Sequence, residues 1–260
     1  MDRNACAEAA QLIAKARRDK TLLKALPDSC RPKTLEEGYA IQHAFLADWD
    51  APTAGWKCAA TAADVQEAYS ISAPFYGRLF APTVYDSPAR PAAGDFGHLC
   101  IETEFAFRFS ASLPPREATY GREEIADAIG ELIPAFEIIS PRFDSLLIGD
   151  VPTCAADCAI NGGAVLGAPC TDWRKLDLAS HEVTFLVNGE VRGTGTGAKA
   201  LGHPLTVLEW LVGALCKDGF GLRAGDVVLT GTCTGFHMVQ PGDEVIGDFG
   251  DLGRVEVSFR

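Results

Sequence analysis

Two signatures of membrane and secreted proteins are absent from this chain of 260 residues. It contains no run of about 18 apolar residues, the length that a helix needs to cross a bilayer. Charges interrupt its first twenty residues, so we expect no secretory signal and a cytoplasmic protein. Among nine scattered cysteines only Cys154 and Cys158 are close together, and no second pair completes a zinc-finger spacing. We therefore interpret the cysteines as reduced thiols.

Basic charge is scarce as well. Acidic residues outnumber basic ones by 35 to 23, and a net charge of −12 argues against a nucleic-acid-binding surface. Hydrophobic residues make up 47% of the chain, which excludes general disorder. Internal repeats, low-complexity segments and long linkers are absent. The length suits one large domain or two modest ones, with enough residues to bury a core.

The first fifty residues have a helical pattern. Apolar residues recur at helical spacing near the N-terminus, and Thr34 begins a capping box for a second helix that continues through Ala47. The stretch 55–60, GWKCAA, predicts a strand, and a short helix is expected to begin near Thr61. We therefore expect an N-terminal helical region over 1–90 that also contains the GWK segment.

Strand patterns dominate after residue 90. We expect a strand over 100–109, a helix over 122–133 and a strand over 134–140. Further on, Asn188-Gly189 is a strong two-residue turn signal and predicts a hairpin. A helix that begins at Pro204 and several closing strands complete the pattern. The fold class is α+β, with mixed but mainly antiparallel strands and a β-rich body over 91–260.

Two glutamates in the stretch CIETEFAF need an explanation. Side chains alternate along a strand, so Glu102 and Glu104 share one face about 7 Å apart, where like charges repel. Glu137 lies in the next predicted strand, also among apolar neighbours. A divalent cation such as Mg²⁺, Mn²⁺ or Ca²⁺ would join these carboxylates. The alternative is an antiparallel sheet with one solvated face, on which such alternation is ordinary.

Three other residues are candidates for chemistry. Lys57 lies in an apolar stretch, where a partly buried lysine can have a lowered pKa and exchange protons; alternatively, its stem packs on Trp56. Asp157 could orient a water molecule or the lysine, or could simply shape a turn. His203 could be a catalytic base, but it precedes a proline at a helix start, so we prefer a structural role. The glycine-rich stretch 193–197 is not a phosphate-binding motif. It lacks the Lys-Ser/Thr ending of a P-loop and the third glycine of a dinucleotide-binding fingerprint.

Taken together, the segments resemble the hydratase/decarboxylase branch of the fumarylacetoacetate hydrolase superfamily, which includes 2-keto-4-pentenoate hydratases. The resemblance runs in order from about residue 35 to the end. The segments that carry it are GWK (55–57), IETEFAF (101–107), PAFEII (134–139), AD (156–157), NGGAVLG (161–167), GTGTGAKALGHPLTVLEWL (193–211), AGDVVLTGT (224–232) and PGDEVIGDFGDLGRVEVSF (241–259).

The resemblance implies a β-roll catalytic domain over 91–260 that binds Mg²⁺ or Mn²⁺ through Glu102, Glu104 and Glu137. It also implies a small 2-oxo acid as substrate and an active site that contains Lys57, with Asp157 as a second catalytic candidate. A 2-oxo acid offers two oxygens to a metal, which would stabilise the enolate. Lys57 would then move the proton that interconverts enol and ketone.

Substrate contacts are expected from Arg78, Leu79 and Thr232. Two positions depart from the family pattern, because Phe75 stands where known hydratases carry an acidic residue and Ile160 lies where a polar group is usual. These replacements leave the expected metal ligands intact but change residues that would determine which reaction the site catalyses. In place of these polar groups, Arg78 could hold a second carboxylate of the substrate; the alternative is an ordinary surface arginine.

The leading hypothesis is a metal-dependent lyase that adds water to a 2-hydroxydienoate, or its 2-oxo-enoate form. The alternatives are a 2-oxo-3-enedioate (4-oxalocrotonate) decarboxylase, an acylpyruvate C–C hydrolase and a non-catalytic partner subunit. The family also implies a homo-oligomer and a place in aromatic-compound degradation. Whether a partner enzyme of the same pathway is required stays open at this point.

Overall fold

The structure is a computed structural model that describes all residues from 1 to 260. Its α-helices are α1 (Arg3–Asp19), α2 (Leu35–Ala47), α3 (Ala63–Tyr69), α4 (Arg122–Asp127), α5 (Val151–Ala156) and α6 (Pro204–Lys217). Its strands are β1 (Thr53–Ala59), β2 (Phe75–Phe80), β3 (Val84–Asp86), β4 (Cys100–Phe109), β5 (Ile129–Ile139), β6 (Asn161–Leu166), β7 (Glu182–Val187), β8 (Glu190–Thr196), β9 (Val227–Met238), β10 (Val245–Asp248) and β11 (Arg254–Val257).

The strands form two sheets. Seven strands follow the order β2-β1-β9-β4-β5-β6-β3, and four follow the order β11-β10-β7-β8. Only the pairs β1–β9 and β3–β6 are parallel, so the expectation of a mixed and mainly antiparallel β architecture is confirmed. Strands β1 to β3 precede residue 90 and belong to the larger sheet. That sheet therefore takes strands from both sides of residue 90, and the division into 1–90 and 91–260 stays a prediction.

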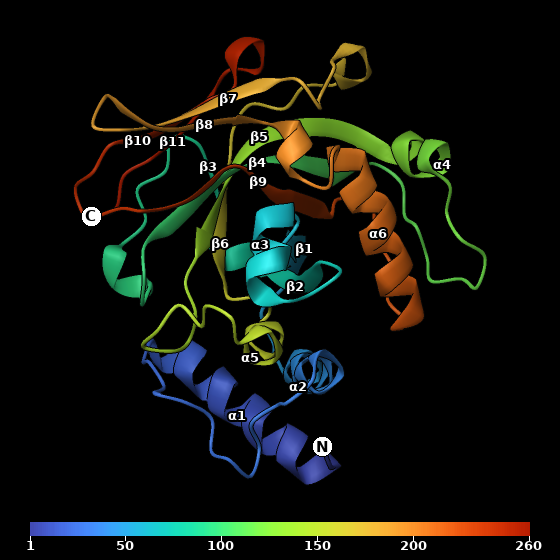
Figure 1. Ribbon diagram of the computed structural model, residues 1–260, viewed down its shortest axis with the longest axis vertical. Helices are drawn as coiled ribbons and strands as arrows, with labels where there is room; N and C mark the ends of the chain where they lie inside the picture. Colours follow the sequence, from blue (N-terminus) through green and yellow to red (C-terminus); the bar gives the residue numbers. More distant parts are fainter.

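The two faces of the larger sheet have different neighbours. The four-stranded sheet covers one face, while α1, α2 and α5 lie at the opposite end of the molecule (Figure 1). Phe105 and Phe107 of β4 belong to the main core, where the Phe105 ring meets that of Phe249 at 5.5 Å. Ala106 points the other way and packs with Leu229 in a smaller core. The alternation predicted for this strand is thus present, and it directs the glutamates toward the second face.

Several local predictions are confirmed. The Thr34 side chain accepts a hydrogen bond from the Glu37 amide at the start of α2. His203 is the N-cap of α6, and its ring accepts from the Leu205 amide, which is the structural role expected of it. The hairpin turns at Asn188-Gly189, both with positive φ.

The predicted helix over 122–133 is wrong in its second half. α4 ends at Asp127, and β5 begins at Ile129 and pairs with the end of β4. Leu132 and Ile133 are both fully buried because this strand is covered on both faces. Consecutive buried positions remove the alternation of a half-exposed strand, so the apolar pattern resembled that of a helix.

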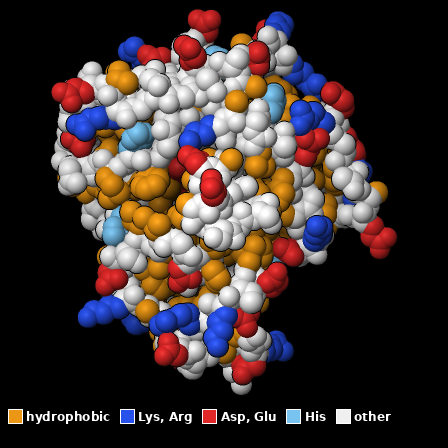
Figure 2. Space-filling view, in the orientation of Figure 1, with side chains coloured by type: hydrophobic (Ala, Val, Ile, Leu, Met, Phe, Trp, Pro, Cys, Tyr) orange, Lys and Arg blue, Asp and Glu red, His pale blue; other side chains and the backbone are white.

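The surface in Figure 2 carries charged side chains of both signs, interspersed around the edge of the view, with apolar side chains across its middle. No helix combines the length and the apolar character that a membrane span requires.

Candidate active site

The three glutamates meet on the buried face of the larger sheet. Glu102 of β4 lies directly opposite Glu137 of β5, and Glu104 follows two residues along the same face. One carboxylate oxygen from each lies within 4.8 Å of the other two. Glu104 and Glu137 are 0% exposed, so the interpretation of a solvated sheet face is wrong.

Burial and the neighbouring charges shift the pKa values of Glu102 and Glu104. Burial raises the pKa of Glu102 to about 7, with a further contribution from the charge of Glu137. Burial, followed by the same neighbour, raises the pKa of Glu104 well above its ordinary value. Glu104 Oε1 and Glu137 Oε2 are buried without a hydrogen-bond donor. Buried carboxylate oxygens without donors are the ligand set that a hard divalent cation requires, so the residues fit Mg²⁺ or a similar ion.

Lys57 of β1 joins this cluster. Its side chain is buried, with Nζ 2.7 Å from Glu137 Oε1, and it donates a hydrogen bond to the Ala159 carbonyl at 3.0 Å. Burial by itself lowers the pKa of Lys57, but the charges of the three glutamates outweigh it and raise the pKa above its ordinary value. The expected lowering is therefore wrong for this arrangement. The expectation that its stem packs on Trp56 is also wrong, because adjacent strand residues point to opposite faces.

Ala159, whose carbonyl accepts the hydrogen bond from Lys57, lies in a strained turn. Cys158, Ala159 and Ile160 all have positive φ, near 50°, a conformation that is costly for residues with a side chain. Asp157 precedes this turn, and its carboxylate accepts from the Arg142 amide at 2.7 Å and lies 3.3 Å and 3.6 Å from the guanidinium groups of Arg142 and Arg17. Both arginines were missed by the sequence reasoning, since they come from separate segments.

These contacts make Asp157 an anchor of the turn that presents Ala159 to Lys57. Its carboxylate is buried and does not line the cavity beside the glutamates. A direct catalytic role for Asp157 stays a prediction, and the contacts indicate a positioning role.

Gly231 is a further residue that the sequence reasoning missed. Its amide donates to Glu104 Oε2 at 2.6 Å, and its φ is +97°. A Cβ at this position would meet Thr61 Oγ1 at 1.8 Å, so only glycine fits. The neighbouring Thr232, a predicted substrate contact, lies opposite Glu104 in β9 and lines the cavity. In the sequence, the signal that could have indicated Gly231 is its place directly before Thr232 in the segment VVLTGT.

A cavity of about 300 Å³ opens beside Lys57 and Glu102. Most of its wall is apolar, including Phe75 and Ile160, the two positions that depart from the family pattern. Lys57 is the one cationic side chain in the wall. At the margin, Asp64 pairs with Lys199 at 3.1 Å. The site therefore combines a polar end, at the glutamates, with an apolar chamber.

Two predicted substrate contacts lie elsewhere. Arg78 is directly opposite Trp56 in the β1–β2 register and lines a different cavity with it. Leu79 is fully buried in the smaller core and does not line the site cavity. The position of Arg78 follows from the register, in which Gly77 rather than Arg78 lies opposite Lys57.

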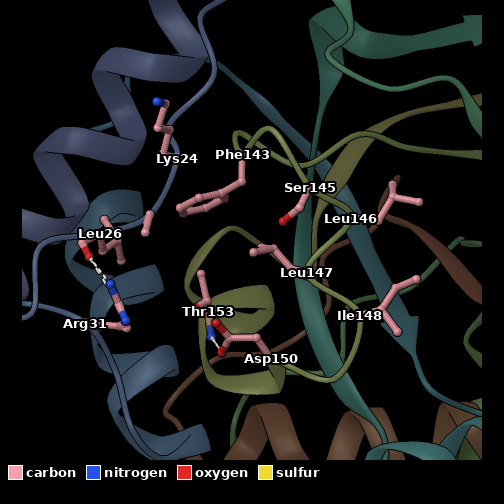
Figure 3. Close-up of a pocket in the computed structure, with 11 residues that line it drawn as sticks. Lys24, Leu26, Arg31, Phe143, Ser145, Leu146, Leu147, Ile148, Asp150 and Thr153 are labelled. Carbon is pink, nitrogen blue, oxygen red and sulfur yellow. Dashed lines mark hydrogen bonds between the residues drawn. The ribbon is translucent and has the colours of Figure 1, made fainter.

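A neighbouring cavity of about 430 Å³ is lined by the segment between α1 and α2, by the loop before α5 and by Thr153 of α5 (Figure 3). Leu146 and Ile148 line both this cavity and the site cavity, so the loop that carries them separates the two. Two charged side chains in its wall have local partners, since Asp150 caps α5 and Arg31 donates to the Leu26 carbonyl. It holds no cluster of titratable side chains comparable to the glutamates.

The chain belongs to the fumarylacetoacetate hydrolase family, because residues 59–260 match the family described as Fumarylacetoacetate (FAA) hydrolase C-terminal. Among its relatives is a 2-keto-4-pentenoate hydratase of Paraburkholderia xenovorans (strain LB400), 28% identical over 255 residues, which are 97% of this chain and 94% of the relative. A 2-hydroxyhexa-2,4-dienoate hydratase of Comamonas testosteroni is also 28% identical, over 96% of this chain and 95% of that relative.

The fold is similar to that of 4-oxalocrotonate decarboxylase from Pseudomonas putida G7, solved in complex with magnesium and adipate. The TM-score is 0.91 at 24% identity, and the alignment covers 100% of this chain and 99% of that one. The two relatives named here are thus hydratases, and this solved structure of similar fold is that of a decarboxylase.

Proposed function

We propose that this protein is a metal-dependent hydratase of the 2-keto-4-pentenoate hydratase type, which adds water to a 2-hydroxydienoate through its 2-oxo-enoate form. The observation that carries the proposal is the contact between Lys57 and Glu137 within a buried cluster of three carboxylates at the end of an apolar cavity. Hydratase relatives along nearly the full chain support it.

Glu102, Glu104 and Glu137 would hold the cation, Mg²⁺ or Mn²⁺. The donor set supports this assignment, and so does the magnesium in the structure of similar fold. When bound, such an ion supplies Lewis-acid stabilisation of the negative charge that develops on the 2-oxo oxygen.

The side chains of this chain then have separate tasks. Lys57 Nζ moves the proton at a carbon of the diene during interconversion of dienol and 2-oxo forms, a step that positioned groups accelerate by about 10² to 10⁴. Ala159 and Glu137 fix the position of Nζ. Thr232 lies beside the polar end, and Phe75 and Ile160 hold the hydrocarbon part and exclude bulk water.

Decarboxylation of a 2-oxo-3-enedioate is the second candidate, because the structure of similar fold is a decarboxylase. Such a dioate carries a second carboxylate. In this cavity Lys57 is the one cation, and it already contacts Glu137; Lys199 lies at the margin in a pair with Asp64. A buried carboxylate without a partner costs several kcal/mol, so the cavity favours a substrate with one carboxylate and an uncharged tail.

Acylpyruvate hydrolysis and a non-catalytic role have less support. His43, the one histidine of the N-terminal helices, contacts Tyr76 and Phe220 and does not line the site cavity, so it supplies no base for acylpyruvate hydrolysis. A non-catalytic partner subunit would not require the buried Lys57 and its three carboxylates. We further propose a cytoplasmic homo-oligomer that acts beside a partner enzyme in aromatic degradation; nine free cysteines support a reducing compartment.

The test is proton NMR of 2-hydroxypenta-2,4-dienoate with the protein and Mg²⁺, with EDTA as control and 2-oxohex-3-enedioate in a parallel sample. The proposal predicts metal-dependent appearance of 4-hydroxy-2-oxopentanoate and little turnover of the dioate. Turnover of the dioate alone, with release of CO₂, would replace the hydratase by the decarboxylase.

A further inference from the structure

Arg78 is a buried cation that the proposed reaction does not use. Its side chain is 6% exposed, and its guanidinium lies over the Trp56 ring, 4.1 Å from the centroid. One amino group donates to the Thr53 hydroxyl at 2.7 Å, and the guanidinium forms no salt bridge. Buried arginines are normally paired with carboxylates, so Arg78 is unusual in this respect.

The surroundings of Arg78 form a third cavity, of about 500 Å³, on the face of β1 and β2 opposite Lys57. Trp49, Phe80 and Phe220 supply its aromatic wall together with Trp56. A second cation, Arg223, lies at its exposed edge.

The charges near Arg78 balance only in part. Burial lowers the pKa of Arg78 to about 10, while Asp226 acts in the opposite direction and Arg223 lowers it further. The Asp226 carboxylate accepts from the Arg223 amide and lies too far from Arg78 for an ion pair. The guanidinium is thus a desolvated cation with unused donors facing an aromatic chamber.

We propose that this cavity binds a small monocarboxylate with a planar apolar body, such as an aromatic acid, at a site separate from the glutamate cluster. The planar guanidinium matches a carboxylate through two parallel hydrogen bonds, and the aromatic wall matches a ring. The proposal rests on the contacts of Arg78 alone and is independent of the proposed hydratase activity.

The experiment is a titration of the full-length protein with benzoate, monitored by tryptophan fluorescence because Trp49 and Trp56 line the cavity. It is performed with Mg²⁺ and again with EDTA. We expect saturable quenching in both conditions and an affinity at least about tenfold weaker in Arg78→Met, since a charge-assisted bond is lost. The matched control is Arg192→Met, at an exposed arginine of β8, which should bind as the wild type does.

Arg78→Lys retains the positive charge but loses the paired hydrogen-bond donors of the guanidinium, so we expect a benzoate affinity between those of the wild type and Arg78→Met. If Arg78→Met does not fold, the comparison of Arg78→Lys with the wild type tests the proposal. Equal binding by wild type and Arg78→Lys, or no saturable quenching at millimolar benzoate, would overturn the proposal. Quenching that requires Mg²⁺ would assign benzoate to the glutamate cluster. Fluorescence that changes with protein concentration alone would assign Arg78 to contact with a second copy of the chain. Either result would also overturn it.

Discussion

Replacement of Lys57 by methionine distinguishes the role of this lysine from that of the three glutamates. At 2.7 Å from Glu137 Oε1, the ammonium contributes a Coulomb attraction of about 6 kcal/mol for an effective dielectric constant of about 20. Desolvation of the lysine offsets part of this, and the loss of one partner of a buried pair typically costs about 3–5 kcal/mol. In EDTA, Lys57→Met should therefore lower the free energy of unfolding by about this amount, measured by urea denaturation.

The same variant should bind the cation more tightly, because a positive charge next to a ligand carboxylate is removed. We expect Lys57→Met to show a lower Kd for Mg²⁺ by isothermal titration and to lose turnover by at least about 10². The matched control is Lys199→Met, since Lys199 is paired with Asp64 at the margin of the cavity; its turnover should change little. Weaker Mg²⁺ binding in Lys57→Met, or unchanged turnover, would refute this account of the lysine.

Three further predictions concern the acidic residues. Glu104→Gln should weaken Mg²⁺ binding by at least about tenfold, and a titration that shows unchanged affinity would remove Glu104 from the ligand set. Without metal, the folded-state pKa of Glu102, about 7, exceeds the ordinary 4.5, so its contribution to stability is present below pH 4.5 and is lost as pH rises through about 7. Melting temperatures in EDTA should fall over this interval, and less so in Glu102→Gln; equal slopes would contradict the shift. Asp157→Asn should lower the free energy of unfolding by about 3–5 kcal/mol because Arg17 and Arg142 lose their buried partner. Denaturation curves that match the wild type would show that the anchor is dispensable.

Much of the site could be predicted from strand alternation. The pattern of β4 placed Glu102 and Glu104 on one face, and the apolar neighbours of Glu137 marked it as unusual. Whether Glu137 lies beside Glu102 depends on the β4–β5 register, which pairs these two residues and which no local pattern contains.

Other features depend on contacts between distant segments. Arg78 was expected at the substrate, but the β1–β2 register places Gly77 opposite Lys57 and turns Arg78 to the other face. The partners of Asp157 come from α1 and from the loop after β5, so no local pattern indicates them. In β5, burial on both faces removed the alternation that identifies a strand, which is why part of it was predicted as helix.

The most direct test of the central claim is solvent deuterium exchange at C3 of a 2-oxo acid, followed by proton NMR in D₂O. The account predicts exchange that requires Mg²⁺, stops with EDTA and is lost in Lys57→Met and Glu104→Gln, while Lys199→Met exchanges as the wild type does. Exchange that is independent of metal, or that survives without Lys57, would contradict a site in which this lysine moves the proton beside a cation held by the three glutamates.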